Sequence, residues 1–145
     1  MYHSIALVSN IAAAAILVLA AIIDIRTGRI PDRLVLAGAA VGLVLAPLNA
    51  QRGLSSGLLG GIAAGLIMLL LNRITRDGLG LGDAKLFACI GIYLGMEDTL
   101  AAMVAAVVLS GIYSLILICV NSENKKRELP FAPFILAGSL GVIFF

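Results

Sequence analysis

The chain has 145 residues, of which 61% are hydrophobic and only 12% charged, and its mean hydropathy is +1.12. A soluble domain carries about 25% charged residues, so the polar surface is too small to cover a water-soluble globule. The net charge of +2 is too small to indicate a nucleic-acid partner. These properties predict a membrane protein with the lipid bilayer as its main partner and no nucleic acid.

Six apolar segments predict an all-α polytopic membrane helix bundle with about six transmembrane helices. They cover residues 4–23, 34–48, 54–71, 84–96, 100–120 and 131–145. A helix needs roughly 17–25 apolar residues to cross the bilayer core, so the shorter segments require local thinning of the bilayer. A re-entrant segment is the alternative for 84–96. No linker is evident, so we assign residues 1–145 to a single membrane-embedded domain.

The first segment is expected to be a retained membrane helix rather than a cleaved signal peptide. No basic region precedes it, and Asp24-Ile25-Arg26 follows it directly. The second segment begins shortly after Pro31, and this proline could occupy the first turn of its helix.

Basic residues alternate between the predicted loops. Nine of the ten lie in or beside loops 1, 3 and 5, namely Arg26, Arg29, Arg33, Arg73, Arg76, Lys85, Lys125, Lys126 and Arg127. Loop 2 has only Arg52, and loop 4 has Glu97 and Asp98 but no basic residue. The positive-inside rule then places loops 1, 3 and 5 in the cytoplasm and both termini outside the inner membrane.

Small residues are concentrated in the third segment, where four glycines lie between residues 57 and 65. Their spacing predicts close packing of helix backbones. Cys89 and Cys119 lie in different apolar segments, and we expect both to be buried, reduced and structural. His3 is the only histidine, so the sequence predicts neither a metal site nor a cofactor.

Asp24 and Asp83 are the two acidic residues that a bundle would bring to the same cytoplasmic boundary. Asp24 ends the first segment and Asp83 opens the fourth. Two carboxyl groups in a partly dry site cannot easily both ionise, so one activates water while the other donates a proton. That pair is the minimum apparatus of an aspartyl protease. Alternatively, Asp83 caps the helix beginning at Ala84, and Asp24 is a counter-ion for Arg26 or Arg29.

Glycines surround Asp83 in the sequence, at Gly78, Gly80 and Gly82. They leave the backbone uncrowded, so an extended peptide could approach closely there, or the chain could adopt a positive φ.

Three short motifs resemble those of the type IV prepilin peptidase family, a group of GxGD aspartyl proteases. Residues 80–86, Gly-Leu-Gly-Asp-Ala-Lys-Leu, resemble the GxGDxKL signature. Residues 24–32 resemble the first-aspartate motif, with Asp32 where Asn is usual. Residues 129–134 are similar to the Pro-Phe-Gly-Pro segment of the last helix, with Ala132 in place of Gly. The matches occur in the family's order and, with the six segments, cover nearly the whole chain.

The resemblance implies that Asp24 and Asp83 form the catalytic pair of a membrane endopeptidase. Its substrates would be type IV pilin-like or preflagellin-like precursors, cut at the cytoplasmic face after a Gly that ends a basic leader. The residues that match the motifs and would support the pair are Gly80, Gly82, Lys85, Pro31 and Pro130. Lys85 would hold the site's electrostatics or only extend to the interface.

The resemblance also implies a short form of the enzyme. Larger members carry an extra cytoplasmic domain with paired CxxC motifs after the first helix, and they methylate the new N-terminus. Here about ten residues separate the first two segments, and there is no CxxC. We therefore expect no methyltransferase domain.

Two alternatives are carried forward. A presenilin-like or signal-peptide-peptidase-like protease also uses a GxGD aspartate, but its other aspartate follows Tyr, whereas Ile23 precedes Asp24 here. A small transporter or channel subunit would use Asp24 and Asp83 as ion or proton sites, and it predicts flux without proteolysis. The sequence leaves the oligomeric state and the individual substrate open.

Overall fold

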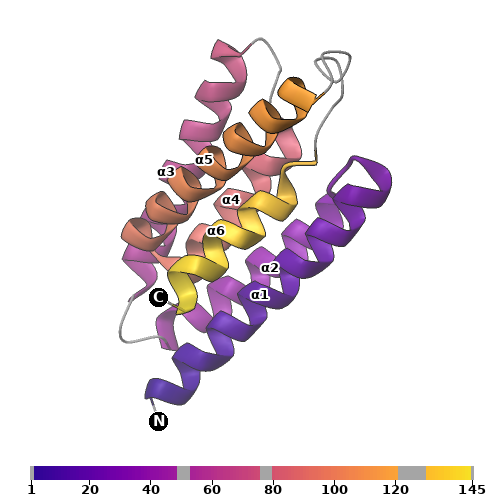
Figure 1. The fold of residues 1–145 in the computed structure, drawn as a ribbon. Helices are drawn as coiled ribbons and strands as arrows, with labels where there is room; N and C mark the ends of the chain where they lie inside the picture. Colours follow the sequence, from indigo (N-terminus) through magenta and orange to yellow (C-terminus); the bar gives the residue numbers. More distant parts are fainter. Residues whose placement is uncertain (1, 49–52, 76–79, 121–129, 145) are drawn as a thin grey trace.

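The computed structural model describes residues 2–48, 53–75, 80–120 and 130–144, and the side chains of 2 and 3 are not described. These residues form six α-helices and one short 3-10 helix, with no strand among them (Figure 1). The helices are α1 (Tyr2–Thr27), α2 (Asp32–Leu45), α3 (Gly53–Ile74), α4 (Leu81–Leu94), α5 (Met96–Val120) and α6 (Ala132–Phe144), and the 3-10 helix η1 is Ala46–Leu48. The all-α prediction is confirmed.

Three of the described helices, α1, α3 and α5, are long and apolar enough to cross a membrane. The helices α2, α4 and α6 have 14, 14 and 13 residues, which corresponds to about 20 Å against a bilayer core of about 30 Å. Many large apolar side chains on the long helices are exposed. Val104 and Leu115 on α5 are examples. Such a surface suits lipid rather than water, and the chain is a membrane protein.

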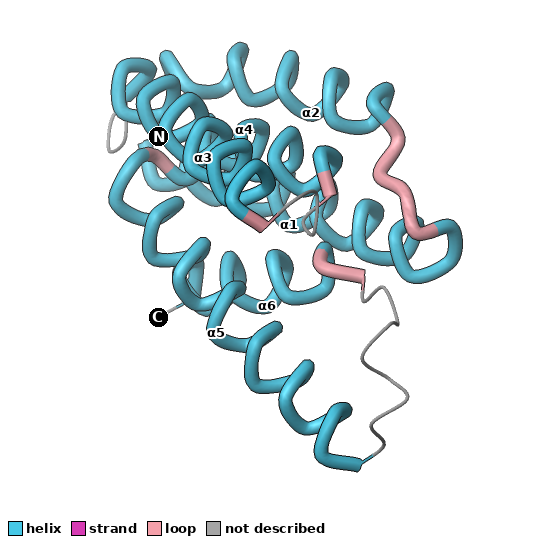
Figure 2. The backbone as a smooth tube through the Cα atoms, turned by 90° about the horizontal axis from the view of Figure 1, so that it is seen from above, coloured by secondary structure: helices cyan, strands magenta, loops and turns pink. Residues whose placement is uncertain are grey.

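The central helix is α4. Nine of its fourteen residues are buried, and α1, α2, α3, α5 and α6 all pack against it. Seen from above, α2 and α5 lie at opposite edges of the bundle (Figure 2). The start of α1 and the end of α6 lie at the same end of the bundle (Figure 1). Because α4 is enclosed, its first turn brings a polar residue into the interior of the bundle.

Glycines hold α3 directly against α4, as predicted from the third segment. A Cβ added to Gly61 would lie 2.6 Å from the Ala88 carbonyl oxygen, and one added to Gly57 would lie 2.5 Å from the Ile92 carbonyl oxygen. On the α4 side, a Cβ on Gly91 would lie 2.4 Å from the Gly61 nitrogen. These distances leave no space for a methyl group, so the two backbones touch.

The structure corrects the predicted end of the first helix. Asp24 does not end α1, because the helix continues to Thr27. The Thr27 hydroxyl donates to the Ile23 carbonyl at 2.8 Å and closes the last turn. Four residues, 28–31, connect α1 to α2. Pro31 precedes α2 as its N-cap residue instead of lying in its first turn.

The fourth predicted loop is a one-residue break between α4 and α5. Gly95 has φ +81°, a conformation that side chains other than glycine rarely adopt, and α5 starts at Met96. Glu97 and Asp98 therefore lie in the first turn of α5 rather than in a loop. Met96, predicted to end the fourth segment, belongs to the next helix.

The two cysteines have different environments. Cys89 is buried, as predicted, but Cys119 is exposed, because α5 has no buried residue beyond Ala106. Several predictions fall outside the described residues, namely those that concern Arg52, Arg76, Gly78, residues 125–127 and Phe145.

Candidate active site

The two aspartates singled out from the sequence line the same cleft. Asp24 lies in the last turn of α1 and Asp83 is the third residue of α4, and each is only 7% exposed. The cleft has a volume of about 280 Å³. It is lined by Asp24, Gly28, Arg29, Ile30, Asp32, Gly80, Leu81, Gly82, Asp83 and Lys85. Two motifs that are about fifty residues apart in sequence thus form one site.

Asp83 is held in an environment that favours its protonated form. Burial, and next the negative charge of Asp24, raise the pKa of Asp83 from its ordinary value of 3.8 to about 7. A hydrogen bond with the backbone of Gly80 acts in the opposite direction and does not offset them. A carboxyl group with this pKa retains a proton for donation near neutral pH.

Asp24 is held by the start of α6. The backbone N–H of Ala132, the first residue of α6, donates to Asp24 Oδ2 at 3.2 Å in a buried contact. The first N–H groups of a helix have no partner within the helix and carry partial positive charge, so this position suits a carboxylate. The ring centroid of Phe131 lies 6.4 Å from that of Phe87 on α4. This contact packs the start of α6 against α4.

Ala132 is a site residue that the sequence reasoning did not identify. Its backbone, not its side chain, makes the contact, and 108 residues separate it from Asp24. The only signal was the resemblance of residues 129–134 to the last-helix motif. Pro130 precedes α6 and is partly buried.

Lys85 forms an ion pair with Asp32 at the edge of the cleft, with 2.7 Å between Lys85 Nζ and Asp32 Oδ1. The two side chains are 53% and 64% exposed, so the pair contributes little to stability. Its position is informative, because it joins Asp32, the first residue of α2, to the second turn of α4. Asp32 occupies the position at which the first-aspartate motif of the prepilin peptidases usually has Asn.

The glycines around Asp83 allow close packing rather than an unusual backbone. Gly80 is the N-cap residue of α4 and has φ −67°, and Gly82 does not have a positive φ either. A Cβ on Gly80 would lie 3.0 Å from Asp83 Oδ2, and one on Gly82 would lie 3.3 Å from the Ile30 Cβ. The expectation of a positive φ is wrong for both, while Gly78 lies outside the described residues.

The helix-capping alternative for Asp83 is only partly correct. The helix begins at Leu81 rather than Ala84, so Asp83 is the third helical residue and its carboxyl group bonds back to the Gly80 backbone. A capping role alone does not explain why Asp83 is buried in the same cleft as the carboxyl group of Asp24. Among the described residues, no group of three His, Cys, Asp or Glu side chains could hold a metal ion.

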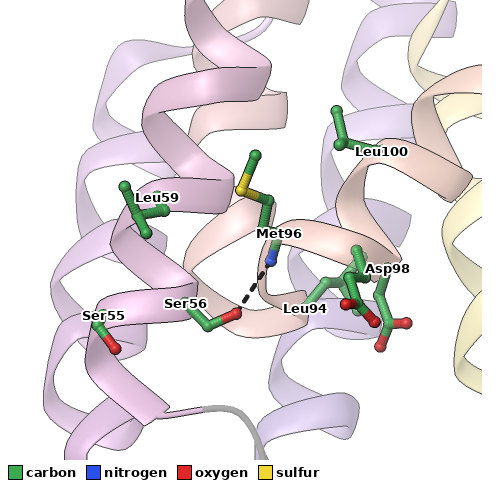
Figure 3. A pocket seen from close by; sticks show the side chains of 8 residues that line it. Ser55, Ser56, Leu59, Leu94, Met96, Asp98 and Leu100 are labelled. Carbon is green, nitrogen blue, oxygen red and sulfur yellow. Dashed lines mark hydrogen bonds between the residues drawn. The ribbon is translucent and has the colours of Figure 1, made fainter.

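A larger hollow lies where α3 begins and α4 meets α5 (Figure 3). Its volume is about 790 Å³, and Ser55, Glu97 and Asp98 are among its polar lining residues. The Ser56 hydroxyl accepts a hydrogen bond from the Met96 N–H at 3.2 Å, so this polar surface supports the break between α4 and α5. It contains none of the motif residues, and the smaller cleft is the candidate active site.

Comparisons with known proteins agree with the motifs. The type IV leader peptidase family matches residues 11–115. A prepilin leader peptidase/N-methyltransferase of Bacillus subtilis is 35% identical over 128 residues, which cover 86% of this chain and 50% of that protein. The protein of the same description from Burkholderia pseudomallei is 33% identical over 137 residues, 91% of this chain and 44% of that protein.

A prepilin leader peptidase/N-methyltransferase of Aeromonas salmonicida is 26% identical over 134 residues, which cover 88% of this chain and 46% of that protein. The chain thus spans about half the length of the curated relatives it matches. No solved structure matches it. The absence of a methyltransferase domain stays a prediction. From the extent of the family match and the identity to its relatives, the chain belongs to the type IV leader peptidase family.

Proposed function

We propose that the chain is an aspartyl endopeptidase that removes the basic leader from type IV pilin-like or preflagellin-like precursors. The observation that carries the proposal is the pair of buried carboxyl groups, Asp24 and Asp83, in one cleft. The names of the relatives, which describe prepilin leader peptidases, supply the substrate class.

The two aspartates take different roles in the proposed reaction. Asp24, which accepts a hydrogen bond from the Ala132 N–H at the N-terminus of α6, takes a proton from the attacking water. Asp83 donates its proton to the scissile carbonyl oxygen as the water oxygen bonds to the carbonyl carbon. The tetrahedral intermediate then collapses. Asp24 passes its proton to the leaving amine, Asp83 recovers a proton from the hydroxyl group, and the C–N bond breaks.

The proposed orientation places the cleft at the cytoplasmic face of the inner membrane and both termini outside. Arg29 lines the cleft, and Arg26 and Arg33 are near it in sequence. Arg73 is in the last turn of α3, and the acidic Glu97 is in the first turn of α5. The positive-inside rule supports this direction. The proposal treats residues 1–145 as a single peptidase domain in which the three short helices also cross a locally thinned bilayer.

Leader removal provides the test. Co-expression with a type IV prepilin should convert the precursor to a faster-migrating product on a denaturing gel. Asp24→Asn and Asp83→Asn should each reduce conversion by at least about a hundredfold, while both proteins still accumulate in the membrane. The matched control Glu97→Gln changes an exposed carboxylate outside the cleft and should keep normal conversion. Near-normal processing by either aspartate variant would remove that residue from the pair.

The same assay addresses the alternative of a small transporter or channel subunit. That alternative predicts ion or proton flux through the protein in vesicles and an unprocessed precursor.

A further inference from the structure

An apolar groove runs between α2 and α4, next to the candidate active site. Its volume is about 400 Å³, and it is lined by Asp32, Val35, Leu36, Ala39, Lys85, Ala88, Cys89 and Ile92. The two charged residues stand at one end, and the remaining surface is apolar or carries a thiol. Leu36 is 68% exposed, so no other part of the described bundle covers it.

The groove lies between two helices that run side by side, a shape that can hold a third helix. Its residues on α2 are spaced by three, four and seven positions from Asp32, and those on α4 have the same spacing from Lys85. Such positions lie on one face of a helix. The positions 38 and 89 are in contact, as are 42 and 93, so α2 and α4 run in the same direction. The groove therefore extends over about two turns, or about 10 Å, away from the ends that carry the ion pair.

The groove and the active-site cleft are continuous. Asp32 and Lys85 line both of them, and the ion pair between these residues forms the border. Another apolar hollow, of about 800 Å³ between α5 and α6, includes Val104 and Gly141 but shares no residue with the cleft. A peptide bound across the aspartates thus reaches an adjoining apolar surface along α2 and α4.

We propose that this groove binds the apolar helical segment of the precursor that directly follows the scissile bond. The inference rests on the proposed function and adds the binding surface for the substrate. A segment at this depth has no water for its backbone groups, so it must be helical, and an apolar helix in a groove is a recurrent mode of recognition. The basic leader cannot occupy the groove, because its charges would be taken into hydrocarbon.

The direction of the substrate follows from this assignment. The leader extends from the cleft into the cytoplasm, and the segment after the cut runs along α2 and α4 toward the outer face. Ala39 and Ala88 provide the shallow floor. Asp32 and Lys85 lie at the border between the cleft and the groove. They face the part of the peptide between the scissile bond and the start of its helix.

Filling the groove tests the proposal. The variant Ala39→Leu adds bulk to the floor, and Ala101→Leu makes the same change in the separate hollow between α5 and α6. The probes are two designed precursors that share a basic leader ending in Gly. One continues into about twenty Leu and Ala residues, enough to span the bilayer, and the other continues into a polar Gly/Ser sequence.

We expect Ala39→Leu to lower kcat/KM for the apolar precursor by roughly tenfold, mainly through KM, and to leave the polar precursor unchanged. Ala101→Leu should match the wild type with both. Equal kinetics of Ala39→Leu and wild type on the apolar precursor would overturn the assignment of the groove. Failure of the wild type to cleave either precursor would instead refute the proposed function.

Photo-crosslinking gives an independent measurement if Ala39→Leu accumulates poorly. A benzophenone amino acid at position 36 in an Asp83→Asn background should crosslink to the apolar segment of the precursor. The same group at position 104, which is also exposed and apolar, should not. Crosslinks at 104 as strong as at 36, or none at 36, would contradict the proposal even if the active enzyme cleaves normally.

Discussion

Replacing Asp83 with Asn is expected to make the stability of the protein less dependent on pH. A carboxyl group with a pKa of 3.8 in the unfolded chain and about 7 in the fold binds its proton more tightly when folded. Its stabilising contribution is fully present below the unfolded pKa, declines from about pH 4, and is lost as the pH rises through the folded pKa. Asn carries no such proton, so this decline should be absent from the variant.

The size of the effect follows from the same pKa values. The difference between 3.8 and about 7 corresponds to about 4 kcal/mol of unfolding free energy. About 3 kcal/mol of this should be lost between pH 5 and pH 8. Thermal unfolding in mild detergent measures it: the melting temperature of the wild type should fall by several degrees more than that of Asp83→Asn over this interval.

The matched control is Glu97→Gln, which removes an exposed carboxylate from the first turn of α5. It should keep the pH dependence of the wild type. If Asp83→Asn and the wild type lost stability in parallel between pH 5 and pH 8, the burial of Asp83 would not raise its pKa, and the assignment of Asp83 as the proton donor would lose its physical basis.

Four further outcomes are expected. The rate of leader removal should fall as the pH rises above about 7, because Asp83 then loses the proton that it donates, and a rate flat to pH 9 in single-turnover assays would contradict this. EDTA should leave the rate unchanged, and a loss restored by zinc would overturn the mechanism. Gly91→Ala should lower stability by about 2 kcal/mol or more, whereas Gly111→Ala, with nothing within 4 Å of its added Cβ, should be tolerated in thermal unfolding. Reporter fusions should place position 125 in the cytoplasm and position 52 outside.

The sequence predicted the helices better than it predicted their ends. Hydropathy marks the part of a helix that contacts lipid, whereas the backbone bonds continue as long as residues tolerate helical geometry. Residues 24–27 are partly polar and still form the last turn of α1. At the other end of α4, Gly95 alone separates α4 from α5, so two apolar segments that look separated by an acidic loop are joined through a single residue.

The contacts within the site could be predicted only in part. The charge pattern placed Asp24 and Asp83 at one boundary, and the structure brings both to one cleft. The partners of the site residues were not predictable, because the contacts of Lys85 with Asp32 and of Ala132 with Asp24 join positions 53 and 108 residues apart. No local pattern specifies such pairs. The contact of Ala132 depends on the backbone and is independent of its side chain.

The alternation of the helices explains why three distant motifs meet. α1 and α3 end at the boundary where α2 and α4 begin, so in a regular six-helix bundle the start of α6 returns to the same side. Two of these helix starts supply backbone contacts to the acids: Gly80 of α4 to Asp83, and Ala132 of α6 to Asp24. A buried carboxyl group needs such partners, since hydrocarbon supplies none. Helix N-termini meet this need for both acids, since none of the basic side chains that the structure describes is buried.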